Sequence, residues 1–106
     1  MKEPDYSYFL IPGSNDEKLN IRFIENRGHI EYFVVQYTAL IKSRWHEIMR
    51  FDTCHGYAHR HTCHLQSEEY IINLTEPGDS LDIVFTESLE HIKQNFQEIK
   101  RNYLNT

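Results

Sequence analysis

Long apolar runs are missing from this sequence of 106 residues. A membrane-spanning helix needs about 18 or more consecutive apolar residues, and no stretch of the chain approaches that length. The apolar stretch nearest the N-terminus, residues 8–12, is also too short for the core of a secretory signal peptide. These absences predict a protein without a membrane segment, and we expect it in the cytoplasm.

Cysteine and positive charge are scarce as well. Two cysteines, Cys54 and Cys63, are too few for the disulfide scaffold of a small secreted protein, so we expect reduced thiols. The formal net charge is -5 with His neutral. This charge disfavours a protein that coats DNA or RNA, because such proteins need a basic surface to displace counterions. It is compatible with an enzyme that contacts a phosphate at one local site.

The chain length predicts a single domain over residues 1–106. Residues 1–16 contain prolines and turn-forming residues, and we expect them to be irregular. Apolar and polar residues alternate over much of residues 17–75, which predicts a β-meander, with a hairpin turn at residues 26–28. Residues 80–104 are expected to be helical.

A change of apolar period near Thr86 predicts one long helix. Its apolar stripe recurs at intervals of three and four residues and consists of Leu89, Ile92, Phe96, Ile99 and Tyr103. Thr86 is the expected N-cap, and residues 79–85 fit either a helical turn or a short strand. Strands followed by one long helix are typical of an α+β fold. We therefore predict an antiparallel sheet of four or five strands with the helix packed on one face.

Alternation along the third predicted strand indicates which face the helix covers. Trp45, Met49 and Phe51 fall on one face, whereas Arg50 and Asp52 fall on the other. We expect the helix to bury the apolar face. The opposite, exposed face would then display Arg50 and Asp52.

The densest group of chemically active side chains lies in residues 50–64. Four of the seven His occur there, with both cysteines, two arginines and one aspartate. If the second half of this segment is a strand, alternation places His59, His61 and Cys63 on one face and Arg60 on the other. This density favours a functional site over a purely structural segment.

One interpretation is acid–base catalysis without a metal ion or other cofactor. A neutral imidazole accepts a proton near pH 7 and an imidazolium returns one, so two His and an Arg can cleave RNA through attack of the 2′-hydroxyl on phosphate. An aspartate would orient one imidazole. The residues assigned to catalysis, which we expect to converge on one exposed face, are Arg50, Asp52, His55, His59 and His61. The residues assigned to substrate binding are Arg60 and Tyr57.

The alternative interpretation is a zinc-binding domain. A His-x-His sequence on a strand turns two imidazoles to the same side, close enough to chelate one ion, and zinc accepts a mixture of nitrogen and sulfur ligands. The alternative ligands are His59, His61, Cys63 and His64. No Cys-x-x-Cys pair accompanies them, so both interpretations stay open.

The sequence Arg50-Phe51-Asp52-Thr53-x-His55-Gly56-x-x-His59 resembles the signature of a small, mostly uncharacterised prokaryotic family, over residues 18–104. More distantly, it is similar to the TumE-type toxins of toxin–antitoxin pairs. The residues that carry the resemblance are Arg50, Asp52, His55, His59 and His61, and those outside its pattern are Cys54, Cys63 and His64. The resemblance implies a toxin-like ribonuclease with RNA as substrate and an antitoxin protein as partner. A third expectation is a non-catalytic module that pairs an aromatic strand edge with a partner.

Overall fold

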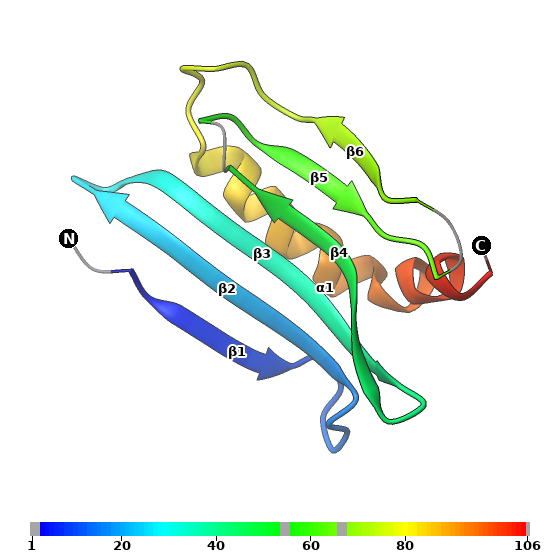
Figure 1. The fold of residues 1–106 in the computed structure, drawn as a ribbon. Helices are drawn as coiled ribbons and strands as arrows, with labels where there is room; N and C mark the ends of the chain where they lie inside the picture. Colours follow the sequence, from blue (N-terminus) through cyan, green and yellow to red (C-terminus); the bar gives the residue numbers. More distant parts are fainter. Residues whose placement is uncertain (1–2, 54–55, 66–67, 106) are drawn as a thin grey trace.

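The computed structural model describes residues 3–53, 56–65 and 68–105 as a sheet covered by one helix. The elements, in chain order, are β1 (Asp5–Phe9), β2 (Glu17–Asn26), β3 (His29–Ile41), β4 (Arg44–Asp52), β5 (His59–Thr62), β6 (Tyr70–Asn73) and α1 (Asp82–Leu104). Each strand pairs antiparallel with the next, so the order across the sheet equals the order along the chain. Helix α1 runs across one face, packed on β3 and β4 (Figure 1). The predicted α+β fold is confirmed.

The sheet has one strand more than the four or five predicted, because residues 1–16 are not irregular throughout. Strand β1 pairs with β2, from Asp5 opposite Arg22 to Phe9 opposite Lys18. All five residues of β1 are exposed. Asp5-Tyr6-Ser7-Tyr8 does alternate between polar and aromatic residues, but the run is short and lies between Pro4 and Pro12, whose turn chemistry favoured an irregular segment.

A register shift between β3 and β4 determines which side chains of β4 face the helix. Tyr37 pairs with Met49, and Thr38 pairs with Glu47, so Ile48 is an extra residue in β4. Such a β-bulge sets two residues of one strand against one of its partner. Ile48 and Met49 are both buried. From Arg44 to Glu47, each side chain of β4 therefore lies on the face opposite to the one that unbroken alternation predicts.

This bulge makes the prediction of Trp45 as a core residue wrong. Trp45 is 47% exposed, and the ammonium group of Lys18 lies 4.8 Å from its ring centroid. His46 faces the helix instead, with Nδ1 2.9 Å from the Tyr103 hydroxyl. One inserted residue exchanges the faces of all side chains that precede it in the strand.

The core fills the space between α1 and the covered face of β2, β3 and β4. The apolar residues with no exposed surface are Leu19, Phe33, Val35, Tyr37, Ala39, Ile48, Ala58 and Ile92. The predicted helix stripe faces this core, since Ile92, Ile99 and Tyr103 are buried and Leu89 and Phe96 are partly buried against it.

Helix α1 begins before the predicted position, which resolves the ambiguity of residues 79–85. Leu81 occupies the N-cap position. Thr86 is inside the helix, where its Oγ1 donates to the Asp82 carbonyl at 3.3 Å, so the prediction of Thr86 as N-cap was wrong. Within the described residues, no helix is long and apolar enough to cross a membrane.

Polar contacts fasten both ends of α1 to the sheet. At its start, the Asp82 carboxylate accepts hydrogen bonds from the Ile30 backbone N–H at 2.7 Å. Near its end, the Lys100 ammonium donates to the Glu17 carboxylate at 2.6 Å, and the Tyr37 hydroxyl donates to the same carboxylate at 2.5 Å. These contacts fix how far along the sheet the helix lies.

Truncating Ile92 to Ala should lower the free energy of unfolding by about 2–5 kcal/mol, because the side chain is fully buried between helix and sheet. Ile83 lies on the same helix but is 70% exposed. Ile83→Ala is therefore the matched control and should cost less than about 1 kcal/mol. Urea unfolding of both variants measures the difference. Equal losses would contradict the helix orientation described above.

Candidate functional site

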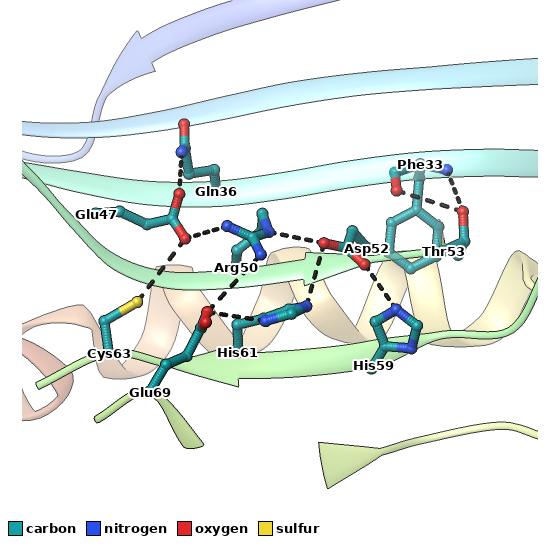
Figure 2. A network of polar contacts seen from close by, with 10 residues as sticks. All are labelled: Phe33, Gln36, Glu47, Arg50, Asp52, Thr53, His59, His61, Cys63 and Glu69. Atoms are coloured by element: carbon teal, nitrogen blue, oxygen red, sulfur yellow. Dashed lines mark hydrogen bonds and ion pairs between the residues drawn. The ribbon is translucent and has the colours of Figure 1, made fainter. Parts of the chain in front are cut away.

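Asp52, His59 and His61 meet on the sheet face opposite α1 and are here called the Asp–His cluster (Figure 2). In the register of β4 and β5, Asp52 lies opposite His59, and Arg50 lies opposite His61. Nε2 of His59 is 2.9 Å from Oδ1 of Asp52, and Nε2 of His61 is 3.3 Å from Oδ2. Four of the five residues assigned to catalysis are thus in one place.

The other residues singled out in the sequence are distributed differently. His55 and Cys54 lie outside the described residues. The Tyr57 ring is close to the cluster, with its centroid 5.1 Å from that of His59. Arg60 pairs in register with Phe51 on the helix-covered face. The two substrate-binding residues expected from the sequence therefore lie on opposite faces of the sheet.

The Asp–His cluster is buried, contrary to the expectation of an exposed face. Asp52, His59 and His61 are 6%, 3% and 8% exposed, respectively. Side chains from outside β4 and β5 cover them: Tyr57 packs edge-on against His59, and the Glu69 carboxylate lies 2.8 Å from Nδ1 of His61. Strand alternation predicts the direction of a side chain, and it carries no information about loops that fold over it.

Arg50 connects the cluster to further carboxylates. Its Nε donates to Oδ2 of Asp52 at 2.7 Å, its Nη1 contacts Oε1 of Glu47, and its Nη2 lies 3.7 Å from Glu69. Burial opposes ionisation of Asp52, but the Arg50 hydrogen bond and the positive charges of His61, Arg50 and His59 outweigh it and lower the pKa of Asp52. Asp52 is therefore an ionised, hydrogen-bonded carboxylate at neutral pH.

Glu47 and Glu69 complete the site and are not evident from the sequence. Simple alternation assigns Glu47 to the apolar face with Met49, and only the bulge at Ile48 turns it towards Arg50. Glu69 precedes β6 in a connection whose path no spacing predicts. With the His neutral, three carboxylates and one guanidinium leave two uncompensated negative charges around the Asp–His cluster.

Several buried atoms of the cluster have close neighbours without hydrogen-bond geometry. Oδ1 of Asp52 and both ring nitrogens of His61 lie within 2.8–3.3 Å of an oxygen or nitrogen. Among the described residues, however, none of these three atoms has a partner in the direction that a hydrogen bond requires. The three residues offer one ligand atom each, all within 4.8 Å of one another. Ligand atoms this close together fit around a single metal ion.

The whole chain, residues 1–106, matches the family model described as Domain of unknown function (DUF7718). The protein belongs to this family. No curated protein and no solved structure shows significant similarity to the chain. The expected membership in an uncharacterised family is thus confirmed, whereas the small size and prokaryotic origin of that family and the more distant similarity to TumE-type toxins stay predictions.

In this DUF7718 protein, neither Cys63 nor His64 belongs to the group of ligand atoms formed by the Asp–His cluster. Cys63 lies in a second group with Glu47 and Glu69, with its Sγ 3.8 Å from Oε1 of Glu47. Burial and the charges of Glu47 and Glu69 raise the pKa of the Cys63 thiol to about 12. The thiolate is the metal-ligating form, and in the absence of a metal ion Cys63 is a protonated thiol at neutral pH.

Alkylation of Cys63 by iodoacetamide at pH 8 in the presence of chelator should be roughly a thousandfold slower than that of a free thiol, because so little thiolate is present. Peptide mapping separates Cys63 from Cys54. Glu47→Gln removes one of the negative charges that oppose ionisation and should accelerate the reaction. Labelling of Cys63 at the rate of a free thiol would contradict the described environment.

Proposed function

We propose that this protein binds a divalent transition-metal ion, of which Zn²⁺ is the representative, through Asp52, His59 and His61. The observation that carries the proposal is the convergence of one carboxylate and two imidazoles, all buried, within 4.8 Å. Around a tetrahedral zinc ion, nitrogen and oxygen ligands lie roughly 3–4 Å apart. The contacts of 2.9 and 3.3 Å between Asp52 and the two His are close to this separation.

The contacts around the cluster support the same proposal. A metal-ligating His usually donates its other ring N–H to a carboxylate, which fixes the tautomer and raises the basicity of the ligand. Glu69 lies 2.8 Å from Nδ1 of His61, while Nε2 of His61 faces Asp52. Arg50 holds Asp52 in a similar way from the other side. A divalent cation would also neutralise the two excess negative charges of the site.

Three protein ligands leave one position of a tetrahedral ion for water or substrate, as in catalytic zinc sites. A bound water would acquire a pKa near 7 and become a nucleophile for hydrolysis. The family-level resemblance adds the proposal of a toxin-like role in the cytoplasm, where Cys54 and Cys63 would stay reduced.

Protein purified without a His tag should contain about one metal ion per chain, or bind one on reconstitution with Zn²⁺, as measured by mass spectrometry of the metal content. Asp52→Asn, His59→Ala and His61→Ala should each abolish this stoichiometry. His29→Ala is the control, since His29 is an exposed histidine that contacts Asp82 and not the Asp–His cluster. Retention of the metal in all three variants would refute the ligand assignment.

The contact from Glu69 to His61 provides a finer test. Glu69→Gln should weaken zinc affinity about 10–100-fold, the usual effect of losing such an outer partner. Its neighbour Glu68 supplies the matched control, because Glu68→Gln changes the net charge equally and leaves the described contact to His61 intact. Equal affinities of the two variants would mean that Glu69 acts only through general electrostatics.

A metal-independent ribonuclease of a toxin–antitoxin pair is the second candidate. The observation that favours it is the direct contact of two imidazoles with one carboxylate that also accepts a hydrogen bond from Arg50. One His would act as base and the other as acid, and Arg50 would stabilise the anionic transition state. In this proposal RNA is the substrate and an antitoxin protein is the partner.

Expression of the wild-type protein alone should then inhibit growth, and purified protein should cleave RNA in the presence of EDTA. His59→Ala and His61→Ala should lower the cleavage rate by about 10²–10⁴-fold while remaining folded. Activity lost on chelation and restored by Zn²⁺ would favour the metal proposal. Equal growth in all cultures, with each protein soluble, would refute the toxin-like role.

A further inference from the structure

A groove lies on the helix-covered side of the sheet, away from the Asp–His cluster. Its volume is about 380 Å³, within the range of roughly 300–1,000 Å³ that small-molecule sites occupy. Its lining comes from the first half of α1, from β4 and β5, and from the segment after β6. Its apolar wall is formed by Phe51, Leu74, Ile83 and Val84. Arg60 and His91 are among the polar side chains that line it.

Arg60 is the unusual member of this wall. It lies opposite Phe51 in the register of β4 and β5, so its side chain extends beneath α1. Its Nε is buried and has no hydrogen-bond partner, and among the described residues no carboxylate forms an ion pair with it. The Arg60 side chain as a whole is only partly buried, but a buried donor without a partner is costly, and folds normally provide one for it.

The surroundings of Arg60 do not supply this partner from the chain itself. His91 and Glu98 line a neighbouring pocket together with Arg60, and Glu98 forms no ion pair with it. Burial and the positive charge of Arg60 outweigh the negative charge of Glu98 and lower the pKa of His91, so at neutral pH its imidazole is uncharged. Glu87 also lines the groove, but it is exposed and forms no ion pair with Arg60. A small anion in the groove would satisfy both the guanidinium and the vacant donor at Nε.

We propose that this groove binds a small amphipathic anion whose carboxylate or phosphate pairs with Arg60 and whose apolar body lies against Phe51, Leu74 and Ile83. The guanidinium group suits both head groups, since its planar donors match their oxygens in pairs. The apolar wall selects a ligand with a hydrocarbon or aromatic body over a bare inorganic ion. This site is independent of the proposed metal centre, which occupies the other face of the sheet.

Octanoate is the first probe, added to the full chain and followed by nitrogen–proton correlation spectra. Saturable shifts are expected at the amides of Thr75, Ser88 and His91. Arg60→Met, which keeps an unbranched, largely apolar side chain and removes the guanidinium group, should weaken octanoate binding roughly 10–100-fold. Arg60→Lys should retain part of the affinity. Octyl phosphate compared with octanoate identifies the preferred head group, and inorganic phosphate alone should bind far more weakly than either.

A second pair of variants keeps the test decisive if Arg60→Met does not fold. Leu74 is 38% exposed, so a polar residue is tolerated there. Leu74→Glu should repel octanoate, while Leu74→Gln, of the same size, should weaken octanoate binding much less.

Absence of saturable shifts, equal affinity of wild type and Arg60→Met, or equal affinity of the Glu and Gln variants would overturn the proposal. If the affinity for octanoate were no higher than that for inorganic phosphate, the proposal that the ligand has an apolar body would be refuted. The metal content of Arg60→Met should remain that of the wild type, so failure here is distinct from failure of the metal proposal.

Discussion

The extra residue that Ile48 introduces into β4 is the constraint on which both faces of the sheet depend. Ile48 and Met49 both enter the core. On the far side of the bulge, His46 contacts the helix through Tyr103, and Glu47 reaches Arg50 on the opposite face. If β4 alternated without a break through Ile48, the Glu47 carboxylate would lie beneath α1, at a large desolvation cost. The same irregularity therefore keeps the core apolar and makes the polar site more acidic.

Charge balance connects the bulge to the proposed chemistry. Glu47, Asp52 and Glu69 surround a single guanidinium, that of Arg50. Taking such an excess of negative charge out of water is unfavourable unless a cation or bound protons compensate it. The two imidazoles in contact with Asp52 offer either solution, since an imidazole can coordinate a metal ion or carry a proton. The two candidate functions are thus two ways of solving one electrostatic problem.

Much of this architecture follows from the sequence, because burial on one face selects alternating residues. Strands β2, β3 and β5 and the stripe through Ile92 and Ile99 obey this rule. The meeting of Asp52 with His59 and His61 also follows, since both strands are short and antiparallel. Alternation cannot reveal where a β-bulge, such as the one at Ile48, interrupts the period of two residues.

The features that the sequence did not predict have separate physical causes. The bulge depends on how β3 and β4 pack together, a tertiary effect that no local pattern records. Strand β1 is held by backbone pairing to β2, and such pairing imposes little on its exposed side chains. Glu69 reaches the site through a connection between strands, where sequence separation and distance in space are unrelated. Alternation does predict that Arg60 lies on the face opposite to His59 and His61, and the structure agrees.

The position of α1 after all six strands has a consequence for synthesis of the chain. Each strand pairs with its immediate predecessor, so the sheet requires only short loop closures and can assemble while translation proceeds. Its apolar face, with Phe33, Val35 and Tyr37, has no cover until the residues of α1 have left the ribosome. During that interval the nascent sheet exposes an apolar surface that is prone to aggregation with other chains. A chaperone that binds extended apolar segments would therefore meet this chain before its helix does.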